Sequence, residues 1–215
     1  MAQGLFITFE GTEGCGKSTQ IKLLAEHLQA IGHRVRLLRE PGGTPIGEEI
    51  RHTLKHSAQN AAMTAEAELL LMNASRAQLV REVIRPALAA GEMVLCDRFY
   101  DSTTAYQGYG RQLDLPTVQR IIDFAVGDTR PNLTLLLNVP LEVSEARRRS
   151  RQVQLPFAEP VRDQMEEADR DFFVRVARGF AAIGAAEPDR VRWIDATQAV
   201  PAVQEAIWRQ VEVLL

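Results

Sequence analysis

Short apolar segments recur along the chain, and the stretches between them repeat apolar residues at helical spacing. Segments rich in strand-forming residues predict strands at 5–9, 35–38, 93–96, 133–137 and 191–194. The remaining periodic stretches predict helices at 17–31, 45–55, 64–90, 102–108, 116–126, 141–151, 163–183 and 201–214, with Pro86 as a candidate kink. Short apolar strands that alternate with helices are typical of a parallel sheet covered on both faces. We therefore expect a three-layer α/β fold.

The length and the continuous alternation predict a single domain over residues 1–215. The stretch 152–162, which carries prolines and charged residues, lies between two predicted helices. We interpret it as a flap within the domain, so that residues 147–166 form a small helical lid, and not as a boundary between domains.

Composition and charge narrow the class of protein. Hydrophobic residues make up 46% of the chain and charged residues 25%, which excludes a disordered chain. The formal net charge of −3 supplies no basic excess for a nucleic-acid polymer. No segment reaches the roughly 18 apolar residues of a membrane span, and residues 1–5 lack the features of a signal peptide. Because Cys15 and Cys96 are the only cysteines, we expect no disulfide framework and a cytoplasmic protein.

The strongest chemical signal is the segment 11–18, whose sequence GTEGCGKS matches the phosphate-binding loop GxxxxGK[ST]. It follows a predicted strand and opens a predicted helix, as that motif requires. Gly11 and Gly16 would let the backbone wrap around a phosphate, with the loop amides pointing at the anion. Lys17 would hold the β- and γ-phosphate oxygens, and the Ser18 hydroxyl would bind Mg²⁺. The residues predicted to bind ATP are Gly11, Thr12, Glu13, Gly14, Cys15, Gly16, Lys17, Ser18 and Thr19.

A second signal is the pair Asp97-Arg98, directly after the predicted strand 93–96. The carboxyl ends of parallel strands form the edge at which α/β proteins bind ligands. Asp97 would orient Mg²⁺ or its water, and the guanidinium of Arg98 would clamp a phosphate. The alternative is a structural ion pair at the end of a strand.

Other segments indicate which kind of phosphate-loop protein this is. None of the asparagines begins an Asn-Lys-x-Asp segment, which guanine-specific GTPases need, so a small kinase is the better candidate. The segments REPGGT at 39–44, SRAQL at 75–79, DRF at 97–99 and STTAYQG at 102–108 follow the phosphate loop. In that order they resemble the bacterial thymidylate kinase family, over nearly the whole length of the chain. The phosphate loop is shared by many NTPases, whereas the REPGG and DR…AYQG segments are much more specific.

The resemblance implies transfer of the ATP γ-phosphoryl to dTMP, giving dTDP for dTTP synthesis, with Mg²⁺ and in a homodimer of P-loop NTP hydrolase-type fold. It implies Lys17, Arg98, Glu13 and Arg151 as catalytic residues, with Ser18 and Asp97 at the metal. The residues that it implies for dTMP are Glu13, Arg39, Glu40, Pro41, Met72, Arg76, Arg98, Ser102, Thr103, Tyr106 and Gln107.

The resemblance also implies what several of these residues would do. Glu13 would meet the 3′-hydroxyl of the acceptor sugar, or Mg²⁺ through water. Arg76 would bond the thymine carbonyl while Met72, where relatives usually carry an aromatic residue, packs on the base. Tyr106 would fill the space below the sugar and disfavour a 2′-hydroxyl. Thr103 and Gln107 would bond the pyrimidine edge, and, less specifically, Thr197 would lie near the adenine.

The lid departs from the family pattern. Relatives carry an Asp-Arg-x-Glu segment, whereas this chain has Gln164 in the place of the arginine. The phosphate loop contains no arginine, yet the transferred phosphoryl needs a cation. Arg147, Arg149, Arg151 and Arg162 are the candidates, and the sequence does not choose firmly among them. Two alternatives stay open: a kinase for another small acceptor, and a nucleotide-binding module that has lost turnover.

Overall fold

The computed structural model describes residues 4–57, 60–153 and 170–215, except for the side chains at 61 and 148–153. Its centre is a 5-stranded sheet in the order β2-β3-β1-β4-β5, in which every neighbouring pair is parallel. This confirms the predicted sheet. The strands are β1 (Phe6–Glu10), β2 (Val35–Arg39), β3 (Met93–Asp97), β4 (Leu133–Asn138) and β5 (Val191–Asp195).

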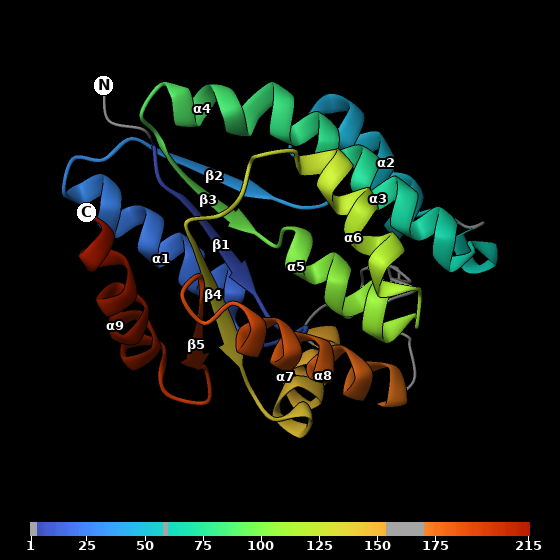
Figure 1. The fold of residues 1–215 in the computed structure, drawn as a ribbon. Helices are drawn as coiled ribbons and strands as arrows, with labels where there is room; N and C mark the ends of the chain where they lie inside the picture. The colour runs from blue at the N-terminus through green and yellow to red at the C-terminus, as the bar shows by residue number, and fades with distance from the viewer. Residues whose placement is uncertain (1–3, 58–59, 154–169) are drawn as a thin grey trace.

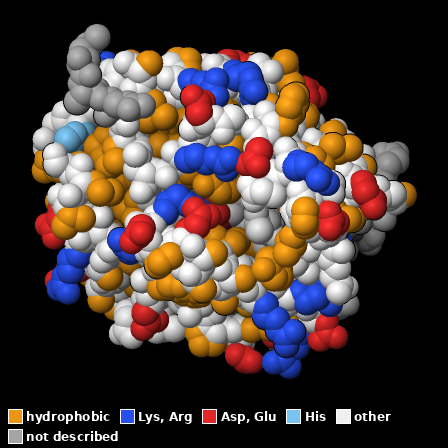
Figure 2. Space-filling model, viewed as in Figure 1, with side chains coloured by type: hydrophobic (Ala, Val, Ile, Leu, Met, Phe, Trp, Pro, Cys, Tyr) orange, Lys and Arg blue, Asp and Glu red, His pale blue; other side chains and the backbone are white. Residues whose placement is uncertain are grey.

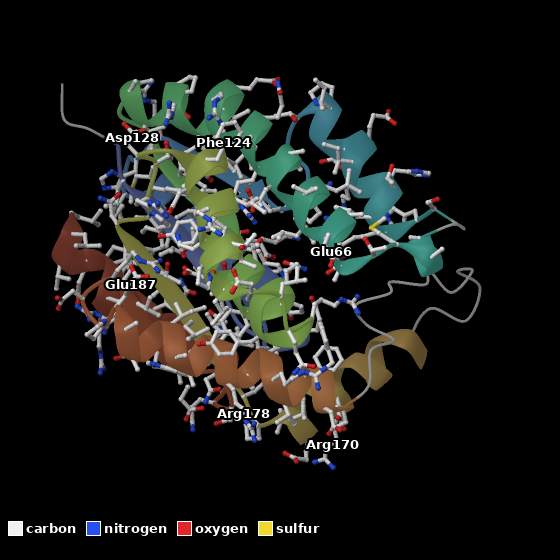
Figure 3. The ribbon with its side chains drawn as sticks, turned by 45° about the vertical axis from the view of Figure 1, so that its right-hand side comes forward. Glu66, Phe124, Asp128, Arg170, Arg178 and Glu187 are labelled. Carbon is white, nitrogen blue, oxygen red and sulfur yellow. The ribbon has the colours of Figure 1, made fainter. Side chains whose placement is uncertain are left out.

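Helices cover both faces of this sheet (Figure 1). They are α1 (Lys17–Ala30), α2 (Pro45–Lys55), α3 (Ala65–Leu79), α4 (Arg85–Ala89), α5 (Tyr100–Thr103), α6 (Leu115–Val126), α7 (Leu141–Val153), α8 (Arg170–Ala186) and α9 (Val200–Val211). Helices α1 and α9 pack on one face, and α3, α4 and α6 on the other. Figure 3 follows α8 from Arg170 past Arg178 to Glu187, just beyond its end.

Successive side chains of the central strand, β1, point to opposite faces of the sheet, which explains why helices cover both faces. All of β1 is buried, so apolar residues are needed on both of its faces. Ile7 and Phe9 point into the core shared with α1 and α9, whereas Phe6 points into the core shared with α3, α4 and α6. Thr8 is also buried, and its hydroxyl shares a hydrogen bond of 2.7 Å with that of Thr134 on β4. The sheet is therefore a fixed platform for the loops at its carboxyl edge.

The predicted helix 64–90 is interrupted by a π-helical turn at Val80–Ile84, between α3 and α4. In that turn the amide of Arg85 donates to the carbonyl of Val80, five residues earlier. Pro86 has no N–H, and its ring would clash with a carbonyl four residues before it in a regular helix. The wider turn just before Pro86 accommodates this residue, where a simple kink was expected.

A second π-helical segment, Thr104–Gly110, continues α5. It occupies the predicted helix 102–108 and packs against α8. Such segments are found frequently at functional sites, because the extra residue redirects the side chains. The early part of the predicted helix 163–183, up to residue 169, and the lid from 154 to 166 lie outside the described residues.

The described surface mixes the two signs of charge. On the face shown in Figure 2, lysines and arginines lie beside acidic side chains and form no continuous basic area among the side chains drawn in colour. In the part of the chain that the structure describes, none of the helices is both long and apolar enough to cross a bilayer.

Candidate active site

The phosphate loop connects β1 to α1 and needs glycine at its turning points. Gly11 and Gly16 have φ angles of 130° and 102°, which L-residues with side chains rarely adopt. A Cβ atom at Gly11 would lie 2.3 Å from the carbonyl oxygen of Leu137, so a close approach to β4 excludes it as well. The loop therefore brings the amino end of α1 to the carboxyl edge of the sheet, where an anion is favoured.

Lys17 and Ser18 are the first residues of α1. The ammonium of Lys17 donates to the carbonyls of Gly11 and Thr12, at 3.1 and 3.0 Å, and so lies within the loop. Ser18 Oγ donates to Asp97 Oδ2 at 2.8 Å, which joins the loop to the end of β3. A hydroxyl beside a carboxylate is the donor set with which proteins hold Mg²⁺, whose other ligands are waters and phosphate oxygens. The described residues contain no larger cluster of metal ligands.

Arg98 connects the phosphate loop to a neighbouring cavity. Its backbone has a φ angle of 72°, an uncommon conformation for a residue other than glycine, and such strain is concentrated at functional sites. Its guanidinium donates to the Gly11 carbonyl at 3.1 Å and pairs with Glu13 on the loop side. On the other side it donates to Ser102 Oγ at 2.8 Å and to the Tyr106 hydroxyl at 3.2 Å.

Glu13 keeps its negative charge in this setting. Burial by itself raises the pKa of this carboxyl, but the positive charges of Arg98 and Lys17 outweigh burial and lower the pKa to about 2. The Glu13 carbonyl accepts a hydrogen bond from Ser144 Oγ at 2.5 Å, so α7 also fixes this part of the loop. The acid therefore stays ionised at neutral pH.

The cavity reached by Arg98 lies beside the loop. Every residue that the resemblance assigned to the acceptor lines it, except Arg39, and Lys55 lines it as well. The lining residues are Glu13, Glu40, Pro41, Lys55, Met72, Arg76, Arg98, Ser102, Thr103, Tyr106 and Gln107. Segments far apart in the sequence thus meet at one concave site, which we call the acceptor cavity.

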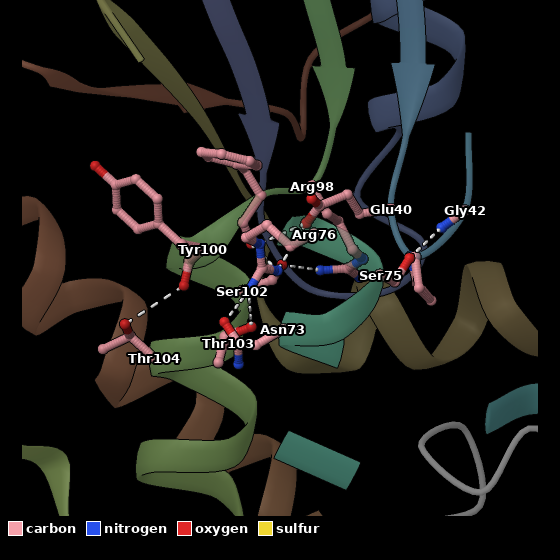
Figure 4. A network of polar contacts seen from close by, with 12 residues as sticks. Glu40, Gly42, Asn73, Ser75, Arg76, Arg98, Tyr100, Ser102, Thr103 and Thr104 are labelled. Atoms are coloured by element: carbon pink, nitrogen blue, oxygen red, sulfur yellow. Dashed lines mark hydrogen bonds and ion pairs between the residues drawn. The ribbon is translucent and has the colours of Figure 1, made fainter. Parts of the chain in front are cut away.

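Arg76 and Glu40 form a buried ion pair at the wall of this cavity (Figure 4). Arg76 Nε and Nη2 donate to Glu40 Oε2 at 2.9 and 2.7 Å, and Nη2 also donates to the Phe99 carbonyl. Nη1 donates to Asn73 Oδ1 and Thr103 Oγ1. All five N–H groups of the guanidinium are therefore in use. A direct bond from Arg76 to a ligand would require one of these contacts to open, so the structure also allows an indirect role.

Two further cavities flank the phosphate loop. One contains Lys17, Ser18, Asp97 and Arg98 together with Arg39, which is absent from the acceptor cavity and pairs with Glu48.

The other cavity is lined by the outer side of the loop and by residues that include Arg147, Ala196 and Gln198. Arg147 donates to the Ala196 carbonyl at 3.1 Å, and Thr197 follows directly after Ala196. The side chains of Arg149 and Arg151, and all of Arg162 and Gln164, lie outside the described residues.

The sequence reasoning missed Glu10, Lys55 and Glu68. Glu10 ends β1 and is fully buried, where it accepts hydrogen bonds from the amides of Phe99 and Ser102 and from the Ser102 hydroxyl. Burial, together with the nearby charge of Asp101, raises the pKa of Glu10 to about 7. An acid at the end of a strand with no other charged residue was the available signal for Glu10. Lys55 on α2 carried no comparable signal, because nothing local distinguishes it from a surface lysine.

The phosphate loop faces a separate cavity, and an arginine lies between them. This arrangement suits transfer of a phosphoryl group, and on a parallel sheet of this order it is typical of a P-loop nucleotide kinase. Comparison with known proteins specifies the family. The sequence model of the thymidylate kinase family, described as "Thymidylate kinase", matches residues 9–207, and the chain belongs to that family.

Individual relatives agree over almost the full length. The thymidylate kinase of Syntrophotalea carbinolica is 46% identical over 203 residues, which cover 94% of this chain and 93% of the relative. That of Deinococcus radiodurans is 45% identical over 213 residues, which cover 98% of both chains. The crystal structure of thymidylate kinase from Ehrlichia chaffeensis matches with a TM-score of 0.77 and 33% identity, covering 98% of this chain and 99% of that one.

Proposed function

We propose that this chain transfers the γ-phosphoryl group of ATP to dTMP, giving dTDP and ADP. The observation that carries the proposal is the position of Arg98, which bonds the phosphate loop at Gly11 and the acceptor wall at Ser102 with one guanidinium. A phosphoryl group that moves from the phosphate loop to the acceptor cavity must pass this positive charge. Family membership supports ATP and dTMP as the two substrates.

On the donor side, the loop amides and Lys17 would hold the ATP phosphates. Ser18 and Asp97 would hold Mg²⁺, which when bound neutralises charge on the phosphates. Their contact of 2.8 Å already places the hydroxyl and the carboxylate side by side. The cavity beside Arg147 and Gln198 would take the adenosine.

On the acceptor side, the phosphate of dTMP would lie against Arg98, and its 3′-hydroxyl would lie near Glu13. Tyr106 presents its hydroxyl to Arg98 and its ring to Phe172 and Phe180, so it forms a firm wall for the sugar. Met72 would pack on the base. Lys55, which lines the same cavity, adds a second positive charge for the acceptor phosphate.

The chemistry is an in-line displacement. An acceptor phosphate oxygen forms a bond to the γ-phosphorus, while the bond from that phosphorus to the β,γ-bridging oxygen breaks and ADP leaves. Because the attacking oxygen is already ionised, the step needs no dedicated general base. The chain contributes alignment of the two nucleotides and fixed positive charge, which together account for most of the catalysis in this class.

A panel of acceptors tests the function. We expect a coupled assay of ADP release to give the highest kcat/KM with dTMP among dTMP, dUMP, CMP, AMP and shikimate. Equal rates with several acceptors would contradict a thymidylate kinase. Tight binding of ATP without formation of dTDP would instead indicate a nucleotide-binding module.

We propose that Arg151 supplies the cation on the transferred phosphoryl, with Arg149 and Arg162 as the other candidates. Arg147 is already engaged by the Ala196 carbonyl. We expect Arg151→Ala to lower kcat by about a hundredfold with little change in the KM for dTMP, because this charge acts mainly in the transition state. Steady-state kinetics measure both constants, and Arg162→Ala is the comparison. If only Arg162→Ala lowers kcat, the role belongs to Arg162.

We also propose a cytoplasmic homodimer. Ile46 on α2, Leu70 on α3 and Phe124 on α6 have exposed fractions of 55%, 56% and 82%. Helix α3 packs against both α2 and α6, and Arg81 of the π-helical turn that follows α3 donates to the Phe124 carbonyl on α6. Large exposed apolar side chains on neighbouring helices favour an interface, here with a second copy of the chain, as the family resemblance also implies. Cys15 and Cys96 are free thiols, which suits a reducing compartment.

A further inference from the structure

The side-chain amide of Gln107 is held from behind by an acid that does not line the acceptor cavity. Gln107 Nε2 donates to Glu68 Oε1 at 2.7 Å, and the two residues are only 1% and 3% exposed. Glu68 lies on α3, one turn before Met72, while Gln107 belongs to the π-helical segment Thr104–Gly110. Gln107 and Met72 both line the cavity, so Glu68 supports this wall from within the protein.

Glu68 determines which end of the amide faces it. Arg111 Nη2 donates to Glu68 Oε2 at 2.9 Å, and the Arg111 guanidinium is itself held 5.1 Å from the centre of the Phe172 ring. A carboxylate paired with a guanidinium accepts hydrogen bonds and donates none. Gln107 must therefore turn its NH₂ group towards Glu68, which leaves its oxygen, an acceptor, for the cavity.

Thr103 provides the opposite polarity on the same wall. Its hydroxyl oxygen accepts a hydrogen bond from Arg76 Nη1 at 2.9 Å, so its proton is left to donate. The cavity thus offers a donor from Thr103 and an acceptor from Gln107. Thymine carries an acceptor at O4 next to a donor at N3–H, whereas cytosine carries a donor at N4 next to an acceptor at N3.

We propose that Glu68 is a positioning residue that sets the pyrimidine specificity of this kinase, by fixing the Gln107 amide so that its oxygen meets N3–H of thymine. The inference rests on the proposed function, because it takes dTMP as the acceptor. Cytosine is rejected because two donors would face each other, and two acceptors would face each other, in a buried site. Rotation of the amide would relieve the clash between its oxygen and N3 of cytosine, and the Glu68 carboxylate prevents that rotation.

The test is Glu68→Gln, which preserves the size of the side chain but can donate as well as accept. Gln107 can then rotate, and we expect the ratio of kcat/KM for dCMP to kcat/KM for dTMP to rise about tenfold. The change should arise mainly from a higher KM for dTMP, with kcat for dTMP near that of the wild type. Steady-state kinetics with both acceptors at saturating ATP measure the ratio.

Arg111→Lys is the matched control, because it disturbs the same buried cluster but keeps a positive charge beside the carboxylate. We expect it to lower the melting temperature and to leave the dCMP to dTMP ratio unchanged. An unchanged ratio in folded Glu68→Gln would overturn the inference, as would an equal rise in Arg111→Lys. If Glu68→Gln does not fold, Glu68→Asp replaces it, because aspartate withdraws the carboxylate by one methylene. We expect Glu68→Asp to raise the dCMP to dTMP ratio, and a constant ratio would overturn the inference. A wild-type enzyme without preference for dTMP would overturn the proposed function instead.

Discussion

Lys17→Ala is expected to lower kcat about a thousandfold while the protein remains folded. The reason is that the ammonium of Lys17 is the positive charge inside the phosphate loop, where the β- and γ-phosphate oxygens of ATP would lie. The loop itself should survive, because glycine backbone geometry and the contact from Ser18 to Asp97 hold it independently of the lysine. Single-turnover formation of dTDP measures the loss, and circular dichroism measures the fold.

Lys22→Ala is the appropriate control for this result. Lys22 lies on the same helix α1, but its side chain is exposed. Its removal changes the net charge by the same amount, and we expect wild-type turnover. Normal turnover in Lys17→Ala would contradict the assignment of residues 11–18 as the site of the ATP phosphates.

The phosphate loop and the sheet could be predicted because their signals are local. The residues of the loop are contiguous, and the spacing of Gly11, Gly16 and Lys17 follows from what the backbone must do around an anion. The strands could be predicted because all-buried parallel strands leave continuous apolar runs. The resemblance to a family added the acceptor residues, and the structure gathers them into one cavity, apart from Arg39.

The pairing of polar side chains could not be predicted, because it depends on contacts between distant segments. Glu68 and Arg111 lie 43 residues apart, and nothing local to either of them indicates the other. The family resemblance implied that Arg76 binds the base directly, but it could not indicate that Glu40, Asn73, Thr103 and the Phe99 carbonyl occupy its donors. The π-helical turn at Val80–Ile84 was missed for a different reason, since a proline in a helical pattern signals a disturbance but not its form.

Arg76→Met is expected to lower the free energy of unfolding by about 3–5 kcal/mol at neutral pH, because it leaves the buried Glu40 carboxylate without its partner. For a chain of this size the melting temperature should fall by roughly 10 °C. The same change should raise the KM for dTMP at least about tenfold, because Thr103 loses the contact that orients its hydroxyl. Thermal unfolding and steady-state kinetics check the two effects separately.

The loss of stability in Arg76→Met should become larger as pH rises. Burial already raises the pKa of Glu40 and outweighs the opposing charge of Arg76, so removal of Arg76 raises the pKa further. The folded variant therefore favours a protonated Glu40, and its stability relative to the wild type should fall as pH rises above the ordinary carboxyl range. Adding Glu40→Gln to Arg76→Met should recover part of the stability and remove this pH dependence, without restoring the affinity for dTMP. Arg36→Met, which breaks an ion pair at the surface, should change stability little, and an equal loss in that variant would show that burial of the Arg76–Glu40 pair is not the cause.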